Sequence, residues 1–416
     1  MKRITVYADF NFLASPQEIG TLGFEHIRGK DHFAFEYSRE WLKQHGGLVM
    51  SGDLINAPAL QHSRGADSVF GFVKDSFPDR WGRLLLDRRE RLMAQTEGRP
   101  VRILTNYDYL TGIEDFTRMG GIRYKSEDSD EYINAGTKYL VPPVESLHAL
   151  SNACREIELA EERNELPDRR WLDQLIDPGS SLGGARPKAN IIDTDGKLYV
   201  AKFPSRKDME NTELLEHFSH RLAAAAGINV AKTRTISISR NRDLLLSERF
   251  DRTSDGKRIH FSSAMSLLGL DDGDGSSTGN GYLDIVDFIL KGCTDVGYNL
   301  RELYRRVAFN VMFGNTDDHF RNHGFLLTPK GWTLSPAYDI NPGLKSHQCL
   351  LIDQYTDQSD ITALLSASSN YMLEQKEASE IIEEVRTTVK DWRRVASELQ
   401  IPLKHLSPYW IKWDNL

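Results

Sequence analysis

The chain has 416 residues and carries 52 Lys and Arg against 60 Asp and Glu, which gives a formal charge of −8. This length predicts two or three domains with ample chain to bury a core. The acidic balance argues against a protein that grips nucleic-acid phosphates over its whole surface, although a local basic patch stays possible. A hydrophobic fraction of 40% and a charged fraction of 27% exclude wholesale disorder.

The cysteines and the apolar stretches indicate the compartment. Cys154, Cys293 and Cys349 stand far apart and form no CxxC pair, which supports neither a zinc ribbon nor a disulfide framework. Such usage is typical of a reducing cytoplasm. Asp9 interrupts the N-terminal apolar run, and the most apolar stretch, residues 222–231, is about half as long as a bilayer requires. We therefore expect a soluble, cytoplasmic protein with no membrane association.

The first 250 residues favour strands, with helices between them. Alternating apolar residues predict strands, and runs of helix formers with apolar residues three or four apart predict helices. Asp-Thr-Asp-Gly at 193–196 predicts a tight hairpin turn. In chain order we expect a strand at 4–7, a helix after Pro78, an acidic loop at 124–137, helices within 151–176, a hairpin at 189–192 and 198–203, a helix at 210–226, and strands at 231–238 and 243–250.

The remainder of the chain has a helical pattern. Residues 269–281 are rich in Gly and Ser and predict a loop, and residues 314–345 interrupt the helices with polar, loop-forming sequence. The chain therefore divides into a β-rich lobe, residues 1–250, and a helical lobe, residues 251–416. A cleft between two such lobes is a preferred place for a ligand.

Residues 177–188 are the first segment with a chemical signature. Ser180, Ser181, Gly183 and Gly184 are small, so their backbone can approach a phosphate closely and offer N–H groups to it. A flexible connector has the same composition. The segment is not a P-loop, because GxxxxGK[ST] is absent.

The strand that follows contains Lys202 within Tyr-Val-Ala-Lys-Phe. A lysine in an apolar strand must reach water or a partner, and the pattern is similar to the VAIK strand of kinases, whose lysine binds nucleotide phosphates. An outward-facing lysine on an edge strand is the alternative. Residues 244–252 then run from a strand into a charged segment, where a kinase would hold adenine by its backbone; alone, that signal is also that of an ordinary strand end.

The strongest segment is 314–323, Gly-Asn-Thr-Asp-Asp-His-Phe-Arg-Asn-His. Asp317 and Asn322 have the spacing of a kinase catalytic loop, in which the carboxylate accepts a proton from the attacking hydroxyl and the amide oxygen holds a metal ion. A metal hydrolase is an alternative, because His319 and His323 have the i, i+4 spacing that presents two imidazoles on one helix face beside Asp317 and Asp318. A capped loop with solvated charges is a third interpretation.

Asp339 lies 22 residues after Asp317 (339 − 317) and follows a short strand at 332–334. A kinase places its magnesium-binding carboxylate in this position. A turn-starting aspartate would also fit. The order of the segments favours a kinase, because a metal hydrolase has no need of the small-residue loop, the strand lysine or the hinge-like strand.

The combination resembles the HipA-type serine/threonine kinases, the toxins of bacterial toxin–antitoxin modules. The resemblance covers most of the chain and lies in residues 70–86, SSLGGARPK at 180–188, VAKF at 200–203, LSERFDR at 246–252, NTDDHFRNHGFLL at 315–327 and LSPAYDINP at 334–342. It implies an α+β, two-lobed, protein-kinase-like fold. The β-rich lobe would carry a family-specific N-terminal subdomain at 1–110 and the nucleotide strands at 140–250, and the C-terminal lobe would be all-helical.

The resemblance also implies roles for particular residues. Asp317 matches the catalytic aspartate, and Asn322 and Asp339 match the magnesium ligands. The implied nucleotide-binding residues are Lys202, Glu248, Phe250, Gly183, Gly184, His319 and Arg321. Ser181, with Ser180 beside it as an alternative, matches the serine whose autophosphorylation inactivates the kinase. The acidic partner of Lys202 is Glu213 or Glu216, and spacing to Gly227 weakly favours Glu216.

The sequence departs from eukaryotic kinases in two motifs, since Asn315 stands where the HRD motif has its histidine and no glycine follows Asp339 as in the DFG motif. We expect an ATP- and Mg²⁺-dependent protein kinase with a HipB-like helix-turn-helix antitoxin, which would bring the pair to operator DNA. A translation component, such as an aminoacyl-tRNA synthetase, is the implied substrate. The alternatives are a small-molecule kinase and a non-catalytic co-repressor partner of the antitoxin.

Overall fold

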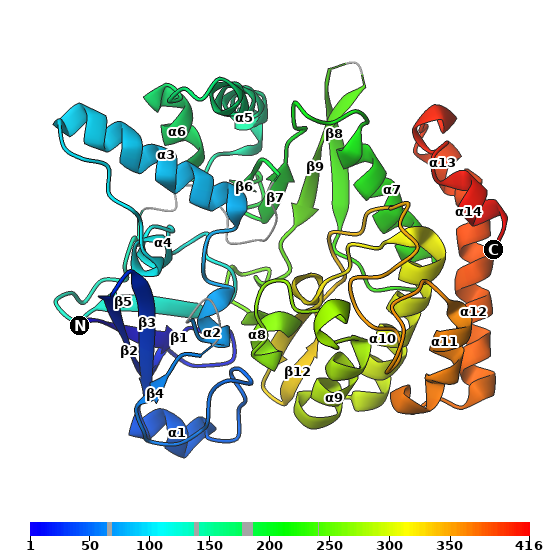
Figure 1. The fold of residues 1–416 in the computed structure, drawn as a ribbon, viewed down its shortest axis with the longest axis horizontal. Helices are drawn as coiled ribbons and strands as arrows, with labels where there is room; N and C mark the ends of the chain where they lie inside the picture. Colours follow the sequence, from blue (N-terminus) through cyan, green and yellow to red (C-terminus); the bar gives the residue numbers. More distant parts are fainter. Residues whose placement is uncertain (65–68, 137–140, 177–185, 240) are drawn as a thin grey trace. The chain divides into compact units, whose positions relative to one another are not determined.

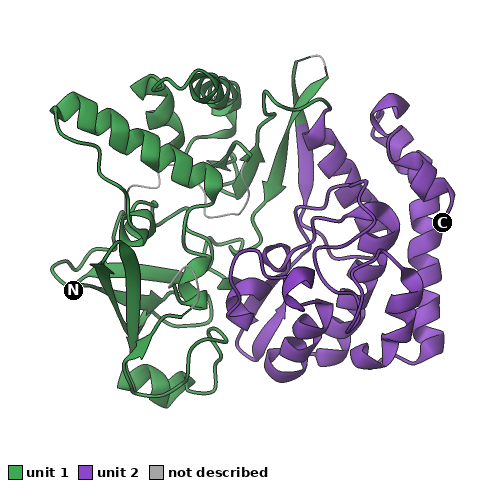
Figure 2. Cartoon of the chain, in the orientation of Figure 1, with its two compact units in different colours: residues 1–209, 236–261 green, residues 210–235, 262–416 purple. Residues whose placement is uncertain are grey.

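The structure, a computed structural model, describes residues 1–64, 69–136, 141–176, 186–239 and 241–416. These residues fall into two compact units (Figure 2). Unit 1 consists of residues 1–209 and 236–261, and unit 2 of residues 210–235 and 262–416.

The first sheet of unit 1 has the strand order β4-β3-β2-β1-β5 (Figure 1). Its strands and the first helices are β1 (Lys2–Ala8), β2 (Gln17–Ile27), β3 (Lys30–Tyr37), α1 (Arg39–His45), β4 (Gln61–His62), α2 (Gly71–Lys74), α3 (Arg80–Glu97), α4 (Asn106–Thr111) and β5 (Ile122–Ser126). Arg28 and Gly29 both have positive φ, the backbone that a two-residue hairpin loop requires between β2 and β3. The predicted strand at 4–7 and the helix after Pro78 are confirmed.

The second sheet has the order β6-β7-β9-β8 and belongs to unit 1 except for the first three residues of β8. It contains β6 (Lys188–Ile192), β7 (Leu198–Lys202), β8 (Thr233–Ser239) and β9 (Arg242–Glu248), with α5 (Leu147–Glu162) and α6 (Arg169–Ile176) before it. β6 and β7 form the predicted antiparallel hairpin. Buried side chains of α3, α5 and α6 share one apolar core with this sheet, among them Leu85, Ile157, Leu172, Ile191 and Leu246. This core holds the strand that ends at Lys202.

Unit 2 is mainly helical. Its elements are α7 (Thr212–Ala225), β10 (Phe261–Ser263), α8 (Ala264–Leu268), α9 (Tyr282–Gly292), α10 (Val296–Phe309), β11 (Gly324–Thr328), β12 (Gly331–Leu334), α11 (Ile361–Ser366), α12 (Gln375–Lys390), α13 (Trp392–Glu398) and α14 (Trp410–Asp414). The sequence predicted an all-helical second lobe with one short strand at 332–334. The structure confirms that strand and adds β10 and β11 beside it, in the order β10-β11-β12.

Aromatic side chains form the centre of unit 2. The rings of Phe313 and Trp413 stack with centroids 5.0 Å apart, and the Trp413 indole N–H donates to the Phe313 carbonyl at 2.7 Å. Phe218 of α7 lies 5.7 Å from the Trp413 ring. The sequence division at residue 250 placed α7 in the first lobe, whereas its buried face packs within unit 2.

Over the described residues, no helix is both long and apolar enough to cross a bilayer.

Candidate active site

The loop at 315–319 begins after a π-helical turn at Asn310–Gly314, which continues α10. Gly314 ends that turn with φ +95°, and an added Cβ would lie 2.9 Å from the carbonyl oxygen of Gly343. Only glycine adopts this conformation readily. The polar loop therefore starts at a fixed point against the segment that follows Asp339.

The two adjacent aspartates of this loop have opposite environments. Asp318 is 4% exposed, and its Oδ2 accepts hydrogen bonds from the Tyr282 hydroxyl at 2.7 Å, Asn310 Nδ2 at 2.5 Å and His323 Nε2 at 2.8 Å. Burial opposes its ionisation, but His323 and the hydroxyl of Tyr282 lower the pKa of Asp318 below its ordinary value. Asp318 is therefore a buried anchor of the loop.

Asp317, in contrast, is exposed, so its carboxylate is accessible to a substrate. Its backbone carbonyl accepts a hydrogen bond from Asn322 Nδ2 at 3.0 Å. Cys349 Sγ lies 3.8 Å from Asp317 Oδ1, and burial together with Asp317 raises the pKa of that thiol, which keeps it protonated. The structure thus brings the predicted proton acceptor and the predicted metal-binding amide into one loop.

The segment that carries Asp339 is tied to the same loop by hydrogen bonds. The Tyr338 hydroxyl donates to the Arg321 carbonyl at 2.6 Å, and the Gly343 N–H donates to the Gly314 carbonyl at 2.7 Å. Asp339 itself has φ 56°, a conformation that is uncommon for residues other than glycine and asparagine and that recurs at functional sites. Asn341 Nδ2 lies 3.3 Å from Asp339 Oδ1 and donates to it.

The donor chemistry of Asn322 and Asp339 fits Mg²⁺. Mg²⁺ prefers hard oxygen ligands and needs only one or two protein groups, because water and substrate phosphates complete its coordination. The Asn322 Nδ2 is used in the bond to Asp317, so Oδ1 is the atom of this amide that a cation would bind.

The alternative of a metal site built on His319 and His323 is not supported. The segment forms a short 3₁₀ turn at Phe320–Asn322 and not an α-helix, so the i, i+4 spacing does not place two imidazoles on one helix face. His323 is buried and donates to Asp318. Within the described ranges, no group of three or more His, Cys, Asp or Glu side chains is arranged to hold a metal ion.

His319 and Arg321 flank this turn. His319 precedes it and is half-buried. Arg321 Nη2 lies 3.3 Å from Oδ1 of Asp272, an ion pair within unit 2. Their nucleotide contacts stay predictions.

Unit 1 carries three further residues predicted to bind the nucleotide: Lys202, Glu248 and Phe250. Lys202 is the last residue of β7 and is half-buried, and it lies opposite Lys188 and Leu245 of the neighbouring strands. Glu248 ends β9, and its carboxylate lies 3.5 Å from Lys197 Nζ. Phe250 follows two residues later, 5.9 Å from the ring of Phe261.

Several predictions have no structural test. Ser180, Ser181, Gly183 and Gly184 lie outside the described residues. Glu213 and Glu216 are both buried on α7, and Glu216 lies 3.9 Å from His220 Nε2. Which of them pairs with Lys202 stays open.

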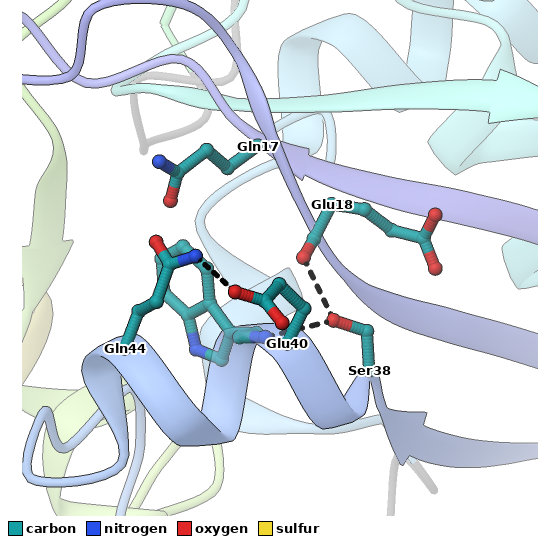
Figure 3. A pocket seen from close by; sticks show the side chains of 6 residues that line it. Gln17, Glu18, Ser38, Glu40 and Gln44 are labelled. Carbon is teal, nitrogen blue, oxygen red and sulfur yellow. Dashed lines mark hydrogen bonds between the residues drawn. The ribbon is translucent and has the colours of Figure 1, made fainter.

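A separate pocket of about 270 Å³ lies in unit 1 beside α1 (Figure 3). It is lined by Gln17, Glu18, Ser38, Glu40, Trp41 and Gln44. In Figure 3 the Ser38 hydroxyl donates to the Glu18 carbonyl, and the Gln44 amide bonds to the Glu40 carboxylate. None of the residues predicted from the sequence lines it, and we do not assign it to the active site.

The chain is similar to known proteins both in sequence and in structure. Residues 180–392 match the family model described as the HipA-like C-terminal domain. Over 199 residues the chain is 26% identical to the serine/threonine-protein kinase toxin HipA of Shewanella oneidensis, an alignment that covers 41% of this chain and 45% of that protein. It is 29% identical over 176 residues to the candidate kinase Y4mE of Sinorhizobium fredii, with coverage of 38% and 41%.

A solved complex of HipA, HipB and operator DNA from Shewanella oneidensis matches with a TM-score of 0.63 and 18% identity. The match covers 95% of this chain and 94% of that one. It shows that the chain has the HipA fold and confirms the predicted kinase-like α+β class. The alignments to curated relatives span about half of those proteins' length.

Proposed function

Because the chain belongs to the HipA-like C-terminal domain family, through residues 180–392, we propose that it is an ATP- and Mg²⁺-dependent serine/threonine protein kinase. We propose further that it acts as the toxin of a toxin–antitoxin module. The observation that carries the proposal is the loop in which exposed Asp317 is followed by the buried anchor Asp318, and in which the Asn322 amide donates to the Asp317 backbone carbonyl. These hydrogen bonds fix the backbone on which the exposed Asp317 carboxylate is presented.

Asp317 would accept the proton of a substrate serine or threonine hydroxyl while the hydroxyl oxygen bonds to the γ-phosphorus of ATP. The bond from that phosphorus to the β–γ bridging oxygen breaks, and ADP leaves. Asn322 and Asp339 would hold Mg²⁺, which neutralises charge on the phosphates when it is bound. Positioning and electrostatics supply most of the rate in such transfers.

Lys202 would bind the nucleotide phosphates, together with the backbone amides of Gly183 and Gly184. Glu248 and Phe250 would bind adenine. The end of a strand is a suitable place to bind adenine, because the chain that leaves a sheet has backbone N–H and C=O groups that no neighbouring strand uses. His319 and Arg321 would add contacts to the nucleotide.

The test is transfer of labelled phosphate from ATP to the chain itself and to a cell extract. Asp317→Asn should lower the rate by about 100- to 10,000-fold, the usual contribution of a general base. Asp287→Asn is a matched control, since Asp287 is an exposed aspartate of unit 2 that lies 3.9 Å from Lys291 on α9. Equal incorporation by wild type and Asp317→Asn would refute the proposal, and transfer to sugars or alcohols alone would indicate a small-molecule kinase.

Autophosphorylation at Ser181, or at Ser180, would inactivate the enzyme. Mass spectrometry after incubation with ATP should place phosphate on one of these serines, and Asp317→Asn should carry none.

The partner would be a HipB-like helix-turn-helix antitoxin. Support comes from the fold shared with the HipA of the HipA–HipB–operator complex. The antitoxin would bring the acidic kinase chain to operator DNA. The protein substrate would be a translation component, for instance an aminoacyl-tRNA synthetase. Phosphoproteomics after brief expression of wild type and Asp317→Asn would identify it, because only wild type should produce the new phosphosite.

A further inference from the structure

The chain that leaves β9 alternates between two environments. Arg249 and Asp251 are 6% and 0% exposed, whereas Glu248 and Phe250 are half-buried. β9 ends at Glu248, and the backbone bends at Phe250 and Asp251. The two residues proposed to bind adenine are therefore the more exposed side chains of this segment, and Arg249 and Asp251 are its buried ones.

Arg249 is held by charged and neutral acceptors at once. It donates to Asp251 at 2.8 and 2.6 Å, to the Thr117 carbonyl at 2.6 Å and to Asn190 Oδ1 at 2.8 Å. Thr117 belongs to the segment between α4 and β5, and Asn190 belongs to β6. One guanidinium thus joins the end of β9 to β6, the strand on the far side of β7 in the same sheet, and to the segment that precedes β5.

Asp251 completes the cluster from the other direction. Its Oδ2 accepts from Arg249, from Arg252 at 2.6 Å and from the Gly120 N–H at 2.8 Å. Burial disfavours its charge, but Arg249 and Arg252 lower the pKa of Asp251 well below the ordinary range. Gly120 has φ +72°, and a Cβ there would lie 3.0 Å from the Phe261 nitrogen, so the two backbones approach closely.

Such a cluster constrains geometry more than it stabilises the fold. A buried ion pair contributes little net stability relative to apolar packing, because desolvation offsets the attraction. Removal of one member strongly destabilises the structure around it, because the remaining partners keep a buried charge without its counter-charge. A guanidinium also has a rigid, planar set of donors, so its acceptors must stay in place. The backbone of residues 248–252 is therefore fixed by contacts to residues 117–120.

We propose that Arg249 and Asp251 are positioning residues for the nucleotide: they fix Glu248 and Phe250 in the conformation that binds adenine, and they do so by anchoring them to residues 117–120 of the N-terminal region. This inference rests on the proposed function, because it takes Glu248 and Phe250 as the adenine contacts. It makes the N-terminal region part of the nucleotide-binding apparatus and not a separate module.

The test compares the ATP dissociation constant and the separate values of KM and kcat in variants of the full chain. Asp251→Asn should weaken ATP binding and raise KM for ATP about tenfold, the change that corresponds to 1.4 kcal/mol. Its kcat at saturating ATP should stay within about twofold of wild type, since each tenfold change in rate needs about 1.4 kcal/mol in the barrier and Asp317 is untouched. Asn190→Ser removes one acceptor of Arg249 and should shift KM in the same direction, which keeps the test valid if Asp251→Asn fails to fold.

The matched control is Glu90→Gln. Glu90 is also a buried carboxylate of unit 1, and it accepts hydrogen bonds from Arg99 and Arg102. It lies on α3, outside the cluster. Glu90→Gln should lower the denaturation midpoint and leave KM for ATP unchanged. If a folded Asp251→Asn or Asn190→Ser variant binds ATP as tightly as wild type, the positioning is refuted. If wild type binds no ATP at all, the proposed function fails first, and the positioning with it.

Discussion

Substitutions of the neighbouring residues Asp317 and Asp318 should have different effects, one on phosphate transfer and the other on the stability of the fold. Asp318→Ala removes the acceptor shared by the Tyr282 hydroxyl, Asn310 Nδ2 and His323 Nε2. Asp317→Ala removes an exposed carboxylate that lies 3.8 Å from the Cys349 thiol. We expect the first change to destabilise unit 2 and the second to abolish phosphate transfer without loss of fold.

The magnitude follows from the number of donors that Asp318→Ala leaves unsatisfied. A buried donor without its acceptor costs about 1–3 kcal/mol, so the three donors together give a loss of at least about 3 kcal/mol. For a domain of 150–250 residues that corresponds to a fall in Tm of about 6–12 °C. Asp317→Ala is a surface substitution and should stay within about 0.5 kcal/mol of wild type.

Urea denaturation followed by tryptophan fluorescence measures this difference, because Trp332, Trp392 and Trp413 are all buried in unit 2. Phosphate transfer is measured on the same preparations below the transition. Asp318→Asn is a useful intermediate variant, because it keeps the shape and one acceptor oxygen and should lose less stability than Asp318→Ala. The reasoning is wrong if Asp318→Ala costs less than about 1 kcal/mol, the low end for a single unsatisfied donor.

Three further outcomes are expected. Burial raises the pKa of Glu114 from 4.5 to about 7, so folding binds a proton and the free energy of unfolding should fall as pH rises between those values. In Glu114→Gln the free energy of unfolding, measured by urea denaturation at pH 4.5 to 8, should depend less on pH. The same pH dependence in wild type and variant would contradict this. Gly314→Ala should destabilise by about 1–2 kcal/mol from its left-handed backbone alone, whereas Gly47→Ala, with open space around the added Cβ, should not; equal midpoints would show that the turn at Gly314 can relax. Chelation of Mg²⁺ with EDTA should stop phosphate transfer and leave the circular dichroism spectrum unchanged, with recovery on addition of Mg²⁺; transfer that persists would remove Asn322 and Asp339 from the proposed metal site.

Local sequence patterns predicted much of the fold. The Asp-Thr-Asp-Gly turn and its flanking apolar runs predicted the β6–β7 hairpin, because turn chemistry and strand alternation act over a few residues. The apolar spacing of residues 210–226 predicted α7 for the same reason. What the pattern could not indicate is the unit in which α7 is buried, since Phe218 meets Trp413 only through tertiary packing.

The candidate site shows the same division between local and distant information. The spacing of Asp317 and Asn322 was visible in the sequence, and the structure joins them by a hydrogen bond. The burial of Asp318 was not visible, because its partner Tyr282 lies 36 residues away in the chain. The burial of Arg249 was not visible either, and the sequence showed this residue only as part of a charged segment at a strand end. Its acceptor Thr117 is 132 residues away in the chain.

The chain passes between the units after Met209, Thr235 and Phe261, and this order has a consequence for synthesis on the ribosome. Phe218 of α7 is made 195 residues (413 − 218) before Trp413, its ring neighbour in unit 2. At a synthesis rate of about 5–20 residues per second, Trp413 is added about 10–40 s after Phe218, and the apolar face of α7 lacks this neighbour during that time. During this interval α7 resembles an exposed peptide ligand, and we expect nascent chains stalled between residues 261 and 400 to bind chaperones through it. A Phe218→Ser chain stalled at the same length should bind less.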